Sequence, residues 1–242
     1  MIIAIIQPSF LPWLGYFEQM AVADVFVYFD DVQYTRKDWR NRNLLKSPYG
    51  VKVVSVPVQK SKREETLIKD ARINCDQPWQ KEMIAKIKEW YRTALFFNDI
   101  FLKIRDIIDQ RYEFLVELNY ALNQAIMDFL KISVPIHFSS DMPDKSTDRN
   151  LKIIDICRHH GANILYDGKS AQAFIDQELF QSHGIKVIFQ DYQHMPYPQL
   201  WGDFESHLSI LDLLMNCGPQ SREILLSSPL PEELQAALGR KR

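Results

Sequence analysis

The chain has 242 residues, of which 46% are hydrophobic and 25% are charged, with a formal net charge of −2. This composition is typical of a globular protein with a buried core, and the charge excludes general electrostatic capture of nucleic acid. We therefore expect no nucleic-acid partner and treat residues 1–242 as a single domain.

Targeting patterns and cysteine spacing point to the reducing cytosol. The opening apolar run has no basic residue before it and prolines directly after it, which does not make a signal peptide. No stretch approaches the roughly 20 apolar residues that a membrane helix needs. The three cysteines are far apart and lack C-x-x-C spacing, so neither a disulfide framework nor a zinc site is expected. These features predict a cytoplasmic protein without a membrane partner.

The first strand and the turn after it organise the chain. Residues 2–6 read IIAII, an apolar run typical of a strand buried on both faces of a parallel sheet. Pro8 and Pro12 fix φ and donate no backbone hydrogen bond, so the strand ends at Gln7 and the next helix starts near Pro12. Gln7 then lies at the carboxyl end of a strand, where open α/β sheets bind ligands.

Helical and strand periodicities alternate along most of the chain. They predict an α/β fold with a mainly parallel, Rossmann-like sheet flanked by helices. Residues 79–131 show helical periodicity alone and are interpreted as an all-helical insertion. Residues 30–50 are polar, irregular and rich in aromatics, which predicts a functional loop, and residues 239–242 are expected to be a frayed tail. In chain order we expect a helix over 13–23, strands over 25–29 and 51–58, a charged turn over 59–65, a short strand over 67–74, helices over 79–91, 101–112 and 113–130, a strand over 134–138, a helix over 148–160, a strand over 163–166, a helix over 171–181, a strand over 185–189, and helices over 209–217, 221–226 and 231–238.

The turn after the first strand is the first candidate for a ligand site. Rossmann-like nucleotidyltransferases carry an H-x-G-H turn at this point, and its histidines hold nucleotide phosphates. Here the turn reads W-x-G-Y, so Trp13 and Tyr16 stand where histidines would be. Two interpretations stay open. Either Gln7, Trp13 and Tyr16 line a pocket for a nucleotide or sugar nucleotide, or Trp13 packs in the core and the prolines only shape the loop.

The second candidate begins with two carboxylates at the end of the second strand. Asp30 and Asp31 are candidate catalytic residues, either as an acid/base pair or as ligands of a divalent cation, and no other metal ligand is predicted. Consecutive side chains on a strand point to opposite faces, so at most one of the two faces a given pocket. The cations that follow alternate with aromatic and amide residues, which favours an anionic ligand over a solvated loop. The candidate binding residues of this segment are Gln33, Trp39, Arg40, Asn41 and Arg42.

The third candidate lies near the carboxyl terminus. On a helix from Ser209, the side chains of Ser209, Asp212 and Asn216 share one face, and the other faces are apolar. Such a polar stripe is paired or solvated in a pocket, and Ser209 fits a helix cap equally well. Ser209 and Asp212 are candidate catalytic residues. The candidate binding residues here are His194, Tyr197, Gln199 and Asn216.

Four blocks of the sequence together resemble one known family. They read QPSFLPWLGYF from Gln7, FDDVQ from Phe29, KDWRNRN from Lys37 and YPQLWGDFESHLSILDLLMNCG from Tyr197. Their order, and their spread over nearly the whole chain, mark a resemblance to the WbqC-like family. Members of that family are encoded among genes for bacterial O-antigen (lipopolysaccharide) and other surface polysaccharides. The resemblance therefore implies a role in polysaccharide biosynthesis without implying a particular reaction.

These patterns lead to one functional hypothesis and one alternative. We expect the strand ends at Gln7 and Asp30 and the segment 192–216 to converge on one pocket for an anionic small molecule, a nucleotide-linked sugar or an activated acyl or aminoacyl donor. Arg40 and Arg42 would hold its charge. The predicted activity is that of a transferase. The alternative is a non-catalytic sugar-nucleotide-binding or assembly factor, and the oligomeric state stays open.

Overall fold

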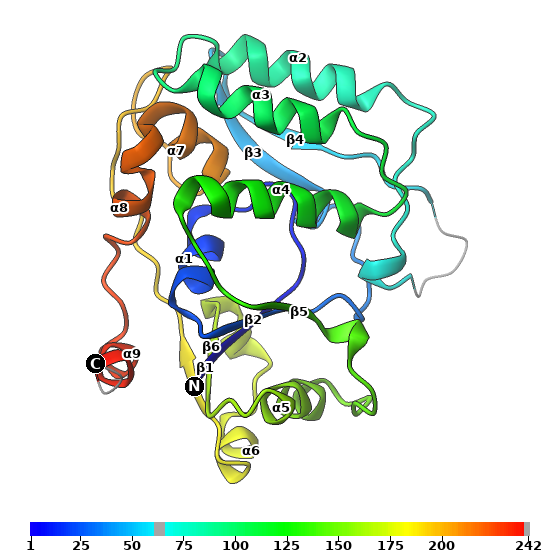
Figure 1. Ribbon diagram of the computed structural model, residues 1–242, viewed down its shortest axis with the longest axis vertical. Coiled ribbons are helices and arrows are strands. Elements are labelled where there is room, and N and C mark those ends of the chain that lie inside the picture. Colours follow the sequence, from blue (N-terminus) through cyan, green and yellow to red (C-terminus); the bar gives the residue numbers. More distant parts are fainter. Residues whose placement is uncertain (61–65, 240–242) are drawn as a thin grey trace.

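A five-stranded parallel sheet lies at the centre of the molecule (Figure 1). The computed structural model describes residues 1–60 and 66–239 of the chain. The strand order is β5-β2-β1-β6-β7, and every neighbouring pair is parallel. The predicted α/β fold with a parallel sheet is therefore confirmed. The strands are β1 (Ile2–Ile6), β2 (Val25–Tyr28), β5 (Ile136–Phe138), β6 (Ile164–Asp167) and β7 (Lys186–Phe189).

β1 is the central strand and is buried on both faces. Ile3 and Ile5 pack into one core, whereas Ala4 packs into the other. β2 and β5 lie on one side of β1, and β6 and β7 lie on the other, so the strand order reverses at β1. In open α/β sheets such a reversal marks the ligand-binding crevice at the carboxyl ends of the strands. Gln7, directly after β1, lies at this edge.

Helices cover both faces of the sheet (Figure 1). One core joins Ala4, Phe26 and Tyr28 of the sheet to α1, α4 and α7. The core on the opposite face joins Ile3 and Ile5 to α5 and α6. Burying the two apolar sheet faces in this way is the main force that holds the layers together. The bounds are α1 (Leu14–Val22), α4 (Leu115–Leu130), α5 (Arg149–His159), α6 (Gln177–Ser182), α7 (Ile210–Cys217) and α9 (Glu232–Gly239).

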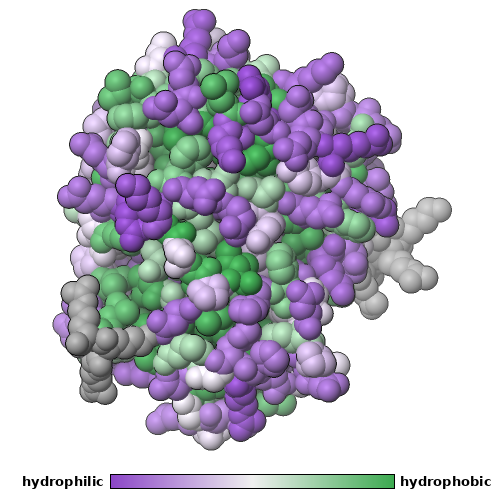
Figure 2. All heavy atoms as spheres, in the orientation of Figure 1, coloured by the Kyte–Doolittle hydropathy of each residue, from purple (hydrophilic) through white to green (hydrophobic). Residues whose placement is uncertain are grey.

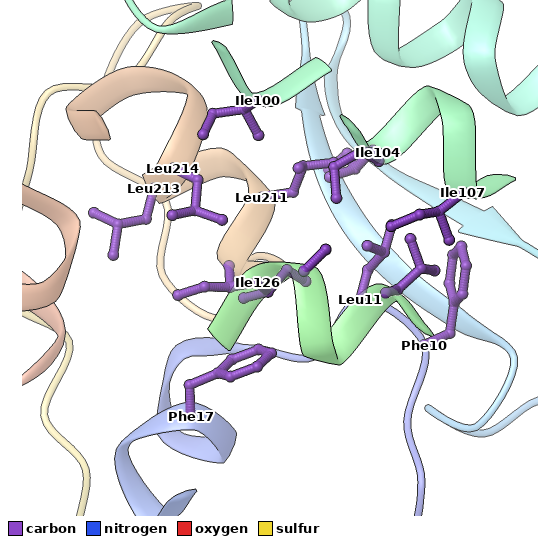
Figure 3. Close-up of a cluster of buried hydrophobic side chains, with 14 of the residues drawn as sticks. Phe10, Leu11, Phe17, Ile100, Ile104, Ile107, Ile126, Leu211, Leu213 and Leu214 are labelled. Carbon is purple, nitrogen blue, oxygen red and sulfur yellow. The ribbon is translucent and has the colours of Figure 1, made fainter. Parts of the chain in front are cut away.

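The segment 79–131, predicted to be helical, contains α2, α3 and α4. Figure 3 shows Ile100 and Ile104 of α3, Ile126 of α4 and Leu211 of α7 in one apolar cluster. The segment therefore shares a core with helices from both ends of the chain. That it is an insertion within a single domain stays a prediction. The two further helices are α2 (Trp79–Tyr91) and α3 (Phe97–Ile108).

The structure corrects the prediction of an irregular loop over residues 30–50. The end of this stretch forms β3 (Arg42–Ser47), which pairs antiparallel with β4 (Gly50–Ser55) in a separate two-stranded sheet. Strand β3 lacks an apolar alternation because Asn43 and Lys46 are buried through hydrogen bonds to other segments. β4 ends before Pro57, which has no N–H for a sheet ladder.

The strand predicted over residues 67–74 is also wrong. This stretch contains a 3-10 helix, in which Ala71 N donates to Ile68 O at 3.2 Å, and its other residues make only isolated bridges. The helix predicted over 171–181 is divided, because the Asp176 side chain accepts from Leu179 N at 3.0 Å and starts a new helix there. The short helices are η1 (Ile68–Asp70), η2 (Ser139–Asp141), η3 (Lys169–Ala173), η4 (Gly218–Gln220) and α8 (Ser221–Leu225).

Two predicted segments lie partly outside the described residues. In the charged turn predicted over 59–65, residues 61–65 are not described. In the tail predicted over 239–242, Gly239 is the last residue of α9 and residues 240–242 are not described. Among the helices that the structure describes, none is long and apolar enough to cross a membrane.

Candidate functional site

The turn after β1 is strained and tied to the segment before β3. Leu11 is fully buried and has a φ of 43°, in the left-handed region that a branched residue rarely adopts. Phe10 N donates to Trp39 O at 3.0 Å, and Asn43 Nδ2 donates to Phe10 O at 3.1 Å. The surrounding contacts therefore hold the turn in a conformation that it would not adopt alone, as is common at functional sites.

The W-x-G spacing in this turn has a direct steric reason. A Cβ on Gly15 would lie 2.2 Å from Cη2 of Trp13, so only glycine lets the indole lie over the start of α1. On its other sides the indole contacts the rings of Tyr192, His194 and His207, with centroids 5.5, 5.4 and 6.1 Å away. Trp13 thus joins the opening turn to the segment after β7.

A buried polar cluster lies beside the opening turn. Tyr16 Oη donates to Gln7 O at 3.4 Å, and Asn123 Nδ2 donates to Tyr28 Oη at 3.1 Å. Asn119 Nδ2 donates to the backbone O of Arg40 at 2.9 Å. The residues come from the ends of β1 and β2, from α1, from the segment before β3 and from α4. We call this set the opening-turn cluster: Gln7, Tyr16, Tyr28, Arg40, Asn119 and Asn123.

Several polar atoms of the opening-turn cluster are buried without a hydrogen-bond partner in the described part of the chain. They are Oε1 of Gln7, Oδ1 of Asn119, Oδ1 of Asn123 and Nε of Arg40. Both asparagine side chains are fully buried. A buried polar atom without a partner costs about 1–3 kcal/mol, so most folded proteins avoid it. Each of these atoms needs a partner from outside the described chain, either an ordered water molecule or a ligand.

Arg40 supplies a positive charge to this cluster. Its side chain is 17% exposed, and its Nη2 lies 3.3 Å from Oδ2 of Asp38. Burial lowers the pKa of Arg40, although Asp38, Tyr16 and Tyr34 favour its charged form. Burial raises the pKa of Tyr16 well above its usual value, so this phenol stays protonated. The phenol already donates its proton to Gln7 O, so the guanidinium is the group that suits an anionic ligand.

The other candidate residues of the segment around Arg40 are Gln33, Trp39, Asn41 and Arg42. The guanidinium of Arg42 is 5.8 Å from the ring of Trp39, which is 47% exposed. Nε of Arg42 and Oδ1 of Asn41 are buried without partners among the described residues. Asn41 Nδ2 donates to Val56 O at 2.8 Å. Gln33 is exposed, and its backbone forms an isolated antiparallel β-bridge with Leu67.

Aromatic rings extend the cluster toward the surface. Tyr28 lies 5.3 Å from Phe138 and 6.1 Å from Tyr120, measured between ring centroids. Tyr120 is 38% exposed. Figure 2 shows hydrophobic residues among hydrophilic ones at the surface near the middle of one face of the molecule. An aromatic wall next to buried polar groups is a common composition for a small-molecule site.

Asp30 is saturated by hydrogen bonds. It is 2% exposed, and its carboxylate accepts from Ser139 Oγ at 3.1 Å, Ser140 N at 2.9 Å and Ser140 Oγ at 2.7 Å. These bonds fix the start of η2 after β5. Because β2 ends at Tyr28, strand alternation does not separate the two aspartates, and Ser139 Oγ contacts both.

Asp31 lies between two lysines. Its Oδ2 is 2.9 Å from Nζ of Lys152 and 3.2 Å from Nζ of Lys145, and its Oδ1 accepts from Ser139. Burial opposes ionisation of Asp31, but hydrogen bonds from Ser139 and Lys152 and the charges of both lysines lower its pKa below the usual value. A carboxylate held in this way is a weak base at neutral pH.

Asp212 is held by two tyrosines away from the opening-turn cluster. It is fully buried, and Tyr91 Oη and Tyr197 Oη donate to its carboxylate at 2.8 and 3.0 Å. Burial raises the pKa of Asp212 despite these hydrogen bonds. Ser209 caps α7, since its Oγ accepts from Leu211 N at 3.2 Å. The cap alternative for Ser209 is thus confirmed.

Gln199 and Asn216 lie near Asp212. Asn216 Nδ2 donates to Asp212 O at 2.8 Å, and Lys46 Nζ donates to Gln199 Oε1 at 3.1 Å. Lys46 also donates to the backbone O of Asp203. Gln199 and Asn216 line a cavity of about 620 Å³ with residues 93–96. These contacts hold the segment between β7 and α7 against β3.

His194 lies next to Trp13 and His207. The two imidazole centroids are 4.2 Å apart, and Nε2 of His194 is buried without a partner among the described residues. Burial, together with the neighbouring His207, lowers the pKa of His194 to about 4. His194 is therefore neutral at pH 7, and its ring packs beside the opening turn as an uncharged group.

These contacts place the predicted residues in three groups, and Trp13 links the first to the third. Gln7, Tyr16 and Arg40 lie in the opening-turn cluster, Asp30 and Asp31 lie at the start of η2, and the residues near the carboxyl terminus gather around Asp212 or Trp13. Sequence reasoning missed Tyr28, Asn119 and Asn123. A sequence signal for the two asparagines does exist. In the stretch N-Y-A-L-N they are spaced i and i+4, which places both on one otherwise apolar face of a helix.

Within residues 1–60 and 66–239, no group of three or more His, Cys, Asp or Glu side chains is arranged to hold a metal ion.

Comparisons with known proteins identify a family and a relative that the chain resembles. The model of the WbqC-like protein family matches residues 7–224. A relative from Mycobacterium tuberculosis (strain ATCC 25618 / H37Rv), named uncharacterized protein Rv1507c, is 35% identical over 227 residues, which cover 92% of this chain and 96% of the relative. No solved structure matches the chain significantly.

Proposed function

The chain belongs to the WbqC-like protein family, and we propose that it is a group-transfer enzyme acting on an activated, anionic donor in the assembly of a bacterial surface polysaccharide. The donor would be a nucleotide-linked sugar or an activated acyl or aminoacyl compound. The observation that carries this proposal is the guanidinium of Arg40, whose side chain is 17% exposed, whose Nε has no partner in the described chain, and whose charge interacts with Tyr16 of the opening turn.

Each proposed role follows from the chemistry of the side chain. Arg40 and Arg42 would bind the phosphate or carboxylate of the donor, because a guanidinium presents paired donors to such groups. Trp39 is exposed and would stack on a base or another flat ring. Bringing donor and acceptor together in a fixed geometry would supply much of the rate enhancement.

A thermal-shift screen with nucleotides, sugar nucleotides and coenzyme A thioesters tests the proposal. A compound at 100 times its dissociation constant stabilises the folded protein by about 2.7 kcal/mol. We expect at least one class to raise the melting temperature of the wild type and not that of Arg40→Gln. The matched control is Arg158→Gln, an exposed arginine on α5 that should bind as the wild type does. Equal binding by Arg40→Gln, or no binding by the wild type, would contradict the proposal.

One observation favours the alternative of a non-catalytic binding or assembly factor. The carboxylates of Asp30, Asp31 and Asp212 are all engaged by hydrogen bonds or lysines, so none is a free general base. Chromatography of a bound donor over hours separates the two functions. Release of the nucleotide or of coenzyme A in the presence of glycan acceptors supports transfer, whereas stoichiometric binding without release supports the alternative.

A further inference from the structure

The cavity of about 620 Å³ beside Gln199 and Asn216 is an open groove where three distant segments meet. Its walls come from the turn between α2 and α3 (residues 93–96), from the segment after β7 (198–200) and from the end of α7 with η4 (216–220). None of the described residues that line it is charged, and most are apolar, among them Phe96, Leu200 and Pro219. Covering this surface is favourable, because apolar area leaves water and no charge is stranded.

The walls of this groove are fixed by contacts within the chain. Phe96 N donates to Met215 O at 3.0 Å, which joins the turn after α2 to α7. The ring of Phe96 lies over Gly218, where a Cβ would be only 2.4 Å from Cδ1 of the ring. On the third wall, Gln199 Oε1 accepts from Lys46 Nζ at 3.1 Å. The groove is therefore preformed, so a partner that fills it need not order it first.

Leu95 stands at the rim of the groove and is 81% exposed, more than any other large hydrophobic side chain of the described chain. Trp201 is 40% exposed, and its Nε1 donates to the backbone O of Trp90 at 2.8 Å, which places the indole near the start of the same turn. Pro198 and Pro219 on the walls are exposed as well. Exposed apolar side chains gathered around an uncharged groove mark an interaction surface.

We propose that this surface is the contact between two copies of the chain, which pair about a twofold axis so that Leu95 of each copy enters the groove of the other. In a twofold dimer the same patch on both copies must be complementary to itself. An exposed apolar side chain beside an apolar groove meets this requirement within one patch. Because the groove is uncharged, two identical surfaces meet there without like-charge repulsion.

A second copy fits this groove better than a small molecule does. Small-molecule sites usually enclose most of the surface of their ligand, whereas here the rim residues Leu95, Pro198 and Pro219 are exposed. The groove shares no lining residue with the opening-turn cluster. The contact between copies is therefore independent of the ligand at Arg40, and it goes beyond the proposed function.

Sedimentation velocity over a range of about 1 to 200 µM protein tests the proposal. We expect the wild type to form a dimer that dissociates within this range. Leu95→Asp should weaken dimerisation at least tenfold, because it would bring a charge into an apolar groove. Leu102→Asp is the matched control, since Leu102 is an exposed leucine on α3 that does not line the groove, and it should dimerise as the wild type does. Circular dichroism establishes that each variant is folded.

Disulfide crosslinking between different chains locates the contact. In a Cys75→Ser background, which removes the exposed thiol, Leu95→Cys is introduced into one chain and Gln220→Cys into another. Gln220 is exposed and lines the groove. Because each chain carries one of the two new thiols, a crosslink between positions 95 and 220 requires that Leu95 of one copy reach the groove of the other. We expect this crosslink after mixing and mild oxidation, and none when Leu102→Cys replaces Leu95→Cys.

Several results would overturn the proposal. A wild type that stays monomeric at the highest concentration contradicts it, and uptake of the uncharged dye Nile red by that monomer would assign the groove to an apolar small molecule instead. A dimer that survives Leu95→Asp, or that Leu102→Asp disrupts equally, places the contact elsewhere. A dimer without the crosslink between positions 95 and 220 shows that Leu95 does not enter the groove of the other copy.

Discussion

Asp31 is a buried charge whose partners come from a distant part of the chain. Lys145 and Lys152 contribute both ammonium groups, and their side chains are only 9% and 16% exposed. Removing one partner of a buried ion pair leaves the others uncompensated. The Asp31 cluster therefore has a structural role, because it fixes the segment after β2 to the start of α5.

We predict that Asp31→Asn lowers the free energy of unfolding at pH 7 by about 3 kcal/mol. The folded-state pKa of Asp31 is lowered, so its contribution is present above the unfolded-state pKa and is lost as the pH falls through the folded-state value. Urea denaturation should thus show a difference between variant and wild type that shrinks in acid. Asp191→Asn, which breaks an exposed pair with Lys169, should cost less than about 1 kcal/mol at either pH.

Glu18 is a second buried carboxyl group, with the opposite shift. It is 1% exposed on α1, and it accepts from Tyr166 Oη at 3.1 Å and from Gln190 Nε2. Burial raises its pKa to about 7, although both hydrogen bonds oppose the increase. Glu18 therefore keeps its proton at pH values where the unfolded chain has lost it.

The consequence is a loss of stability as the pH rises. Between the usual pKa of 4.5 and about 7, the folded state binds more protons than the unfolded state, so the free energy of unfolding falls. The total is about 3 kcal/mol. Glu18→Gln should remove this contribution and change the slope measured by urea denaturation from pH 5 to 8, and Glu178→Gln, an exposed residue on α6, should not. An unchanged slope in Glu18→Gln would refute the assignment.

At the scale of elements, the position of the Trp13 indole depends on the absence of a side chain at Gly15. The indole occupies the space in which a side chain at position 15 would stand, 2.2 Å from the missing Cβ. The same indole contacts the rings of Tyr192 and His194. Displacing it would therefore disturb both the start of α1 and the segment after β7.

We predict that Gly15→Ala destabilises the protein by about 2 kcal/mol through overpacking and changes the tryptophan emission. Gly168→Ala is the control, because a Cβ there would lie 3.9 Å from its nearest neighbour, in ordinary contact. In a Trp13→Ala background, Gly15→Ala should cost much less, since the clash is gone. Equal costs in both backgrounds would show that the clash with the indole is not the cause.

The elements that the sequence predicted best are those with strong local signals. The run IIAII and the prolines after it determine β1 and its end at Ile6. Strand β3 was missed because its buried polar residues are satisfied by segments far along the chain, such as Gln199 for Lys46. Local periodicity carries no information about such partners.

At the scale of the whole molecule, one core joins distant parts of the chain. It contains Phe26 of the sheet, Ile104 of α3, Leu122 of α4 and Leu214 of α7. The opposite core, with Ile154 of α5, lies on the other face of the same strands. Because the sheet is common to both cores, unfolding one should expose the other.

We therefore predict that the chain unfolds in a single cooperative transition, with coincident curves from tryptophan fluorescence and far-ultraviolet circular dichroism. Ile104→Ala and Ile154→Ala should each shift the whole transition, by about 3 kcal/mol, although they lie in different cores. An early, separate transition in Ile104→Ala would show that residues 79–131 fold as an independent unit, contrary to a single domain.

The sequence by itself determined the strand-helix alternation, the parallel sheet and the position of Gln7 at its carboxyl edge, because apolar periodicity and proline act locally. It also indicated Arg40, through cations interleaved with aromatic residues. Only the tertiary structure decided that Asp31 pairs with lysines and that Asn119 and Asn123 face Tyr28 and Arg40. The physical reason is that a polar side chain obtains its role from the partner it meets, and these partners lie far away in the chain.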